Sequence, residues 1–192
     1  MRHGARWRNA FLQHSSFQKS LTFALIDLQA RHARHTGQMN DYRANRVAGH
    51  SYFFTVRLSE RGSTLLTDHI AAFGEAIRQA RSRKPFHVDA WVALPDHAHA
   101  IWTLPPGDED CAARWRAVKI AFSKSLSKAR ATRGTEIIWE PHYQQHPVGS
   151  DDYAGLVDYI HHNPLRHGLC GAPQEWQWSS VHRFIAAGMV AY

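Results

Sequence analysis

Two short segments carry side chains whose types and spacing suit metal-dependent chemistry on phosphodiesters. His97 and His99 alternate along an apolar run, so a strand there points both imidazoles to one side. Tyr159 and Asn163 are four residues apart, which places them on one face of a helix. Two imidazoles and an amide oxygen can hold a divalent metal, and a tyrosine hydroxyl beside that metal can act as a nucleophile.

Such a group of side chains is suited to breaking and rejoining a phosphodiester. The metal polarises a phosphate oxygen and stabilises the charge of the transition state. Attack by the tyrosine forms a phosphotyrosine bond and frees a hydroxyl on the other side of the break. Because that bond keeps the energy of the phosphodiester, rejoining needs no nucleotide cofactor. The amide ligand suits Mg²⁺ or Mn²⁺, which prefer oxygen.

Each of these residues also has an ordinary structural explanation. Fifteen histidines in 192 residues produce close pairs by chance, and a single tyrosine is more often part of a core than a nucleophile. His161, His162 and His167 would suit a helix end, where the dipole favours imidazolium. A zinc hydrolase is a further alternative, but the chain lacks His-Glu-x-x-His and Cys-x-x-Cys patterns.

Strands are predicted by β-branched, aromatic and alternating apolar residues. Residues 51–58 are rich in aromatic and β-branched side chains. Residues 86–94 and 98–104 are predicted to form a hairpin, because the connection between them, Pro95-Asp96, is short and typical of a turn. A further short strand is expected near 147–148.

Helices are predicted where apolar residues recur at helical spacing. This pattern covers 65–83 and 111–130. A third helix is expected to begin at Ser150, a good N-cap residue, and to run to about Asn163, because Pro164 discourages continuation. The resulting order of strands and helices predicts an α+β fold, with one antiparallel sheet and helices packed on it.

Composition and charge favour one folded domain preceded by a basic extension. Hydrophobic residues make up 44% of the chain, which argues against disorder of the whole. Residues 1–38 hold six basic side chains and one acidic one, whereas residues 39–192 hold 17 and 15, so the domain itself is only mildly basic. We expect residues 1–38 to be either a disordered tail ahead of a true start at Met39 or a functional arm.

The sequence predicts a cytoplasmic protein with no membrane partner. No apolar stretch approaches the ~20 residues that a membrane span needs, and the N-terminal residues lack the apolar core of a signal peptide. The two cysteines, Cys111 and Cys170, share no motif spacing and suit a reducing compartment.

One helix also carries a stripe of basic side chains opposite its apolar face. Positive side chains in such a row neutralise phosphates with an affinity that depends on salt but not on sequence. The alternative is an ordinary solvated helix face. The predicted DNA-binding residues of the stripe are Arg116, Lys119, Lys124 and Lys128.

Two blocks of the sequence resemble a known family. Residues 92–104 (VALPDHAHAIWTL) and 157–168 (VDYIHHNPLRHG) are similar to the two signature blocks of the REP-associated tyrosine transposases, which are single-tyrosine HUH endonucleases. The resemblance extends over roughly residues 42–185 and includes 52–58 and 138–141. Both blocks are present in the correct order, which makes the resemblance specific. It implies a ferredoxin-like antiparallel sheet flanked by helices.

The resemblance also implies roles for individual residues. His97 and His99 match the two histidines of the HUH motif, and Ala98 is a small version of its hydrophobic middle residue. Tyr159 matches the nucleophile, and Asn163 matches the third metal ligand, which follows the tyrosine by four residues. Residues 1–38 have no counterpart in the family pattern.

The implied function is cleavage and rejoining of single-stranded DNA with Mg²⁺ or Mn²⁺, at repetitive extragenic palindromes (REPs) folded as hairpins. The alternative is a hairpin-binding regulator of the same fold in which catalysis is weak or lost. The expected partners are DNA hairpins, and either a monomer or a homodimer is compatible with the resemblance.

Overall fold

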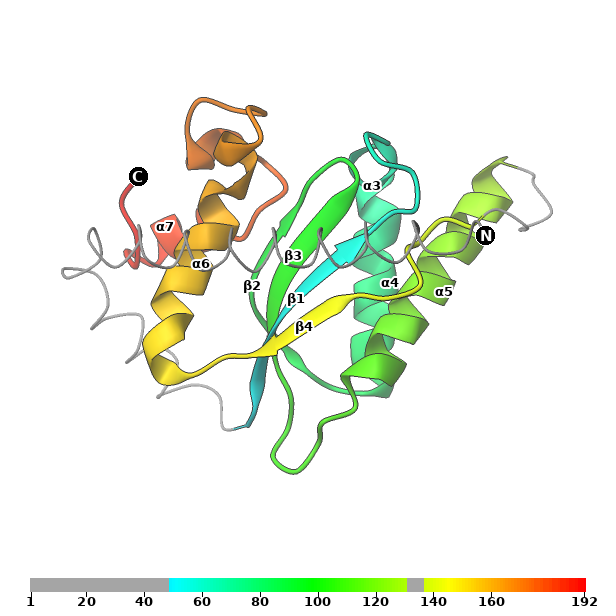
Figure 1. The fold of residues 1–192 in the computed structure, drawn as a ribbon, viewed down its shortest axis with the longest axis horizontal. Coiled ribbons are helices and arrows are strands. Elements are labelled where there is room, and N and C mark those ends of the chain that lie inside the picture. The colour runs from blue at the N-terminus through cyan, green and yellow to red at the C-terminus, as the bar shows by residue number, and fades with distance from the viewer. Residues whose placement is uncertain (1–48, 131–136) are drawn as a thin grey trace, which may run out of the picture.

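A computed structural model describes residues 49–130 and 137–192, which form a four-stranded sheet between two layers of helices (Figure 1). The predicted extension, residues 1–38, and the proposed start at Met39 lie outside the described residues. Within the described ranges, no helix combines the length and the apolar character needed to cross a membrane.

The predicted strands are all present, with small shifts at their ends. The strands are β1 (Ser51–Arg57), β2 (His87–Ala93), β3 (His97–Thr103) and β4 (Gln144–Pro147). They lie in the order β2-β3-β1-β4, and every neighbouring pair is antiparallel. This order, with helical crossovers after β1 and β3, is ferredoxin-like, so the predicted α+β class is confirmed.

The helices α3 (Leu65–Asp68), α4 (Ile70–Arg83) and α5 (Cys111–Arg130) lie on one side of the sheet (Figure 1). The prediction of one continuous helix over 65–83 was wrong, because the chain leaves helical geometry at His69, with φ −120° and ψ 34°. The amide of Leu66 donates to the carbonyl of Pro95, 3.1 Å away. The β2–β3 turn therefore holds the short α3 apart from the axis of α4.

The other side of the sheet is covered by α6 (Ser150–Arg166), with the short η1 (Pro173–Glu175) and α7 (Val181–Ala186) beside it. Gly149, rather than the predicted Ser150, occupies the N-cap position. The predicted end at Asn163 was also wrong, because α6 continues through Pro164.

The last turn of α6 explains how a helix can continue past a proline. Proline lacks an amide hydrogen, but its fixed φ is compatible with a helix. The amide of His167 donates to the carbonyls of Asn163 and Pro164, and the amide of Leu169 donates to that of Pro164. Pro164 itself is buried, so packing against the body of the protein holds the turn in place.

The C-terminal segment closes the free edge of β2. The amide of Ala93 donates to the carbonyl of Trp178 at 2.9 Å, and the indole of Trp176 donates to the carbonyl of Ala93 at 2.9 Å. Val92 also forms a bridge with Ser179. This segment leaves little of the edge open to pairing with another chain.

Alternation along the strands divides the core into two parts. On the α6 side, the core gathers around Phe53, Ile101 and Ile160, which are fully buried. On the α4 and α5 side, Trp102 and Trp115 stack with ring centroids 4.1 Å apart. Both sides of the sheet are therefore covered by packed helices.

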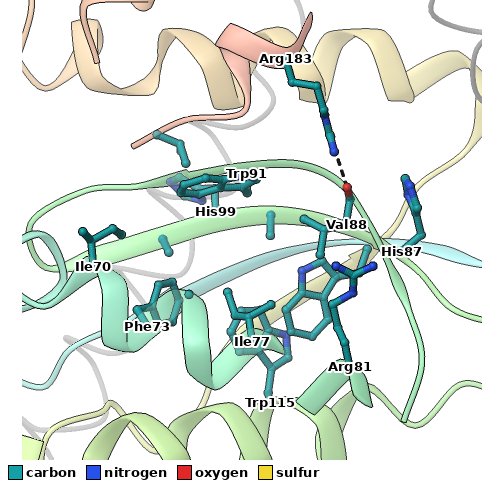
Figure 2. A pocket seen from close by; sticks show the side chains of 15 residues that line it. Ile70, Phe73, Ile77, Arg81, His87, Val88, Trp91, His99, Trp115 and Arg183 are labelled. Carbon is teal, nitrogen blue, oxygen red and sulfur yellow. Dashed lines mark hydrogen bonds between the residues drawn. The ribbon is translucent and has the colours of Figure 1, made fainter. Parts of the chain in front are cut away.

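A cavity of about 280 Å³ lies between α4 and the sheet, beside β2 (Figure 2). Figure 2 shows Phe73, Ile77, Val88 and Trp91 along its walls, with Arg183 at one side. The nucleophile predicted from the sequence, Tyr159, does not line it. Of the predicted metal ligands, His99 is among the residues that line this cavity.

Candidate active site

The two histidines of β3 point toward α6 at the end of the sheet. In the β1–β3 ladder, His97 lies opposite Arg57, and His99 lies opposite Thr55. Cross-strand partners project from the same face of a sheet. The centroids of the two imidazole rings are 5.2 Å apart, so both rings face one small region above the buried ring of Phe53.

The helix α6 brings the second predicted segment to the same region. The ring of Tyr159 lies edge-on to His99, with centroids 5.4 Å apart, and edge-on to Phe53, with centroids 5.9 Å apart. Asn163 follows one turn later on the same helix face, and its side chain acts to lower the pKa of Tyr159. The structure thus brings together all four residues predicted as nucleophile and metal ligands.

Each histidine is held by a neighbour at its Nδ1 atom. The Nδ1 of His97 lies 2.6 Å from a carboxylate oxygen of Asp96, and the Nδ1 of His99 lies 2.8 Å from the hydroxyl of Thr55. Asp96 is itself held by the amide of Gly62, at 3.0 Å. Because Nδ1 is occupied in both rings, Nε2 is the atom that each imidazole offers to a metal.

Burial keeps both imidazoles uncharged near neutral pH. It lowers the pKa of His97 to about 4, against the opposing effect of Asp96. It also lowers the pKa of His99 well below its usual value, and the positive charge of Arg57 acts in the same direction. Since a metal binds only the unprotonated ring, these histidines are ready to act as ligands without first losing a proton.

Asn163 provides the observation that best tests whether a metal fits here. Its side-chain oxygen is buried and has no hydrogen-bond partner among the described residues. A buried acceptor of this kind is costly unless something binds it. In 49–130 and 137–192, no three His, Cys, Asp or Glu side chains gather as a metal site; the amide oxygen of Asn163 is a donor of another type beside the two histidines. Two neutral imidazoles and this oxygen can hold one divalent metal ion, and the oxygen is the donor type that suits Mg²⁺ or Mn²⁺.

Tyr159 lies in an environment with opposing effects on its hydroxyl. The residue is 9% exposed, and burial raises its pKa. The side chain of Asn163 and the charges of Arg166 and Arg57 oppose that rise, because each of them favours the phenolate. The guanidinium carbon of Arg166 lies 5.2 Å from the centre of the tyrosine ring.

Sequence reasoning missed several residues of this region. Arg166 and His167 were not assigned to the site because α6 was expected to end at Asn163. The ring of His167 lies 5.1 Å from that of His97. The positions seven and eight residues after Tyr159 lie on the same helix face as the tyrosine. Helical periodicity would therefore have pointed to both residues if the helix had been predicted to continue past Asn163.

The alternative explanation of the other histidines is only partly correct. His162 lies near the end of α6 and contacts the carboxylate of Asp158 at 3.1 Å. His161, by contrast, is fully buried between α6 and the C-terminal segment, where its ring nitrogens contact Ser180 and Tyr192. It is therefore a core residue and does not decorate the helix end.

The predicted basic stripe lies on α5, across the sheet from Tyr159. Arg116 and Lys124 are exposed. Lys119 is partly buried, and its amino group donates to the carbonyl of Glu140 at 2.8 Å. The side chain of Lys128 lies outside the described part of the structure. The role of these residues in DNA binding stays a prediction.

Comparisons with known proteins agree with this arrangement. No protein-family model matches the chain. A REP-associated tyrosine transposase of Escherichia coli K12 is 39% identical over 152 residues, which cover 79% of this chain and 88% of that protein. The chain belongs to the REP-associated tyrosine transposase family.

Two further comparisons support this membership of the tyrosine transposases. A putative REP-associated tyrosine transposase of Haemophilus influenzae is 34% identical over 157 residues, which cover 78% of this chain and 89% of that protein. A solved structure of a REP-associated tyrosine transposase bound to a REP hairpin is 38% identical, with a TM-score of 0.69. It covers 78% of this chain and 87% of the solved one.

The contact between Asp96 and His97 leads to a prediction for this tyrosine transposase. We expect Asp96→Asn to weaken Mn²⁺ binding about tenfold, because the imidazole loses the carboxylate that orients it and raises its basicity. Titration calorimetry with Mn²⁺ measures the effect. Asp151→Asn, at an exposed carboxylate in the first turn of α6, is the matched control and should bind Mn²⁺ normally. Unchanged affinity in Asp96→Asn would contradict the assigned contact.

The buried histidines predict that the metal-free protein loses stability in mild acid. Burial lowers the pKa of His97 to about 4 and that of His161 to about 3, so between these values and about pH 6.5 only the unfolded chain takes up protons. Stability therefore falls as the pH drops below about 6.5, by up to ~1.4 kcal/mol per pH unit for each histidine. Urea unfolding in EDTA at several pH values measures this slope. A stability that stays flat from pH 7 to pH 5 contradicts it, and His161→Gln should reduce the slope.

Proposed function

We propose that this protein cleaves and rejoins single-stranded DNA at REP hairpins through a covalent phosphotyrosine intermediate. The observation that carries the proposal is the meeting of β3 and α6, where the ring of Tyr159 lies edge-on to His99 and Asn163 follows one helical turn after the tyrosine. The membership of the tyrosine transposase family supports the reaction class. The related structure bound to a REP hairpin supports the substrate.

In the proposed reaction, Tyr159 is the nucleophile. Its hydroxyl oxygen attacks the phosphorus of one linkage, so an oxygen–phosphorus bond to tyrosine forms and the bond to one sugar oxygen breaks. The tyrosine gives up its proton, and the departing sugar oxygen takes one up as a free hydroxyl. Attack by a DNA hydroxyl on the phosphotyrosine reverses these steps and rejoins a strand. The amide of Asn163 assists the first step, because it favours the phenolate.

We propose that His97, His99 and Asn163 hold one Mg²⁺ or Mn²⁺ ion. When bound, the ion supplies Lewis-acid polarisation of the phosphate beside Tyr159. The role of the protein is to hold the three ligands in fixed positions. Asp96 and Thr55 orient the two imidazoles, and the buried amide oxygen of Asn163 faces no competing donor among the described residues.

We also propose that α5 contributes to holding DNA outside the catalytic centre. Arg116 and Lys124 line a groove of about 330 Å³ between α4 and α5, together with Arg83. Three cationic side chains along one groove suit a phosphate backbone. Lys119 contributes less to this proposal, because its amino group already bonds to Glu140 and packs near Trp139. Lys128 is proposed as a continuation of the stripe.

The function is tested by looking for the covalent adduct. Purified protein is incubated with a labelled single-stranded oligonucleotide that carries a palindromic repeat of the host with its unpaired flanks, in Mn²⁺, in Mg²⁺ or in EDTA. We expect a protease-sensitive, slowly migrating band on denaturing gels with metal and none in EDTA. If the protein binds the hairpin but forms no adduct in either Mn²⁺ or Mg²⁺, the proposed function is contradicted.

A cytoplasmic location and a monomeric or dimeric state are also proposed. A measurement of molecular size in solution tests the oligomeric state.

A further inference from the structure

Two arginines from separate parts of the fold lie near the proposed nucleophile. Arg57 is the last residue of β1, and it pairs across the ladder with His97. Arg166 is in the last turn of α6, seven residues after Tyr159 on the same helix face. Both charges act on the Tyr159 hydroxyl, and the guanidinium of Arg166 lies over the tyrosine ring at 5.2 Å. The sheet and the helix therefore each bring one guanidinium to the catalytic centre.

The surroundings of Arg57 favour an anion. Arg57 is partly buried, and burial together with the charge of Arg61 lowers its pKa. Two acids, Asp96 and Glu140, act in the opposite direction. Asp96 is already engaged by the ring of His97 and the amide of Gly62.

Among the described residues, the other groups near Arg57 include the rings of His97, His99 and His167, which carry no negative charge. A phosphodiester entering here would meet two guanidinium groups and two fixed imidazoles. Guanidinium is the side-chain group best matched to phosphate, because its planar fork donates two parallel hydrogen bonds.

We propose that Arg57 and Arg166 form a clamp that binds the phosphodiester to be cleaved and holds it against the hydroxyl of Tyr159. This inference rests on the proposed function and adds a substrate-binding role for two residues outside the predicted metal site. The clamp contacts the non-bridging oxygens of the phosphate, so it recognises charge and shape and carries no base specificity. It is distinct from the groove of Arg116 and Lys124, which lies across the sheet.

The clamp makes a prediction that a purely structural role for the arginines does not make. If Arg166 served only to pack on the tyrosine ring, its loss would weaken binding of every oligonucleotide alike. If both arginines hold one phosphate, replacing either of them weakens hairpin binding only when that phosphate carries its negative charge. The decisive measurement therefore varies the charge of single DNA linkages as well as the protein.

The experiment is a scan with neutral linkages in the Tyr159→Phe protein, in EDTA, so that neither cleavage nor metal contributes. Each linkage of the unpaired flank is replaced in turn by a methylphosphonate, and hairpin binding is measured by fluorescence anisotropy. At one linkage we expect neutralisation to weaken binding about tenfold, the size of one charge-assisted contact. Adding Arg57→Met or Arg166→Met should reduce that effect to less than about twofold.

Matched variants separate the clamp from folding and from general charge. Arg78→Met removes one exposed arginine of α4 on the other side of the sheet, and should leave the linkage effect unchanged. Arg57→Lys keeps the charge and the fold, and should restore part of the effect.

Two results would overturn the proposal: no linkage is sensitive in Tyr159→Phe, or the sensitive linkage keeps its full effect when either arginine is replaced. Because the scan needs no cleavage, it is independent of the adduct assay. An adduct from the wild-type protein combined with a negative scan would reject the clamp alone, whereas absence of the adduct would reject the catalytic function.

Discussion

Replacing Tyr159 with phenylalanine is expected to abolish the covalent adduct and to lower strand cleavage by at least about a thousandfold, the scale on which loss of a catalytic nucleophile acts. The only atom removed is the hydroxyl oxygen that attacks the phosphorus. The ring contacts with Phe53 and His99 are kept, so the fold and hairpin binding should change little. Denaturing gels report the adduct, and anisotropy with the same hairpin reports binding.

The matched control for this change is Tyr153→Phe. Tyr153 lies on the same helix but is fully buried in the core on the α6 side of the sheet. Its variant should keep the adduct. If the adduct survives in Tyr159→Phe and disappears in Tyr153→Phe, the nucleophile has been assigned to the wrong turn of α6.

Replacing His97 with alanine is expected to lower metal-dependent cleavage by at least about a hundredfold, while hairpin binding stays within about threefold. The variant removes one of two neutral imidazoles and leaves Asp96 without its contact to the ring, although the amide of Gly62 still donates to it. Mn²⁺ affinity, measured by titration calorimetry, should fall together with activity. That parallel fall distinguishes loss of a ligand from loss of some other catalytic contact.

An exposed histidine provides the control for His97→Ala. His142 lies in the loop before β4, and His142→Ala should leave both cleavage and Mn²⁺ affinity unchanged. Thermal unfolding of the His97→Ala protein is measured alongside, because His97 is 4% exposed. Equal losses of cleavage and hairpin binding with a lowered melting temperature would indicate misfolding and would argue against a ligand role.

Much of the catalytic geometry follows from local periodicity. The two-residue period of a strand places His97 and His99 on one face, and the helical period does the same for Tyr159 and Asn163. These relations hold wherever the two elements lie, so they can be recognised from the sequence without the tertiary structure. The strand and helix order likewise determines the α+β class, because each element must bury one apolar face.

The end of α6 shows where local rules failed. Pro164 predicted a stop at Asn163, yet burial of the proline and the hydrogen bonds of the last turn extend the helix to Arg166. Whether a proline ends a helix depends on what packs against it, which no local pattern contains. Without that extra turn, Arg166 would not lie over the ring of Tyr159.

What the sequence alone determined is therefore the set of reactive side chains, their pairing within each element and the family to which they point. Only the tertiary structure decided how the pairs meet: the register that sets Arg57 opposite His97, the hydroxyl of Thr55 on His99, and the position of α5 across the sheet from Tyr159. The physical reason is the range of the interactions involved. Periodicity is set by neighbours in the chain, whereas register, burial and pKa are set by residues far apart in sequence that pack together only in the folded protein.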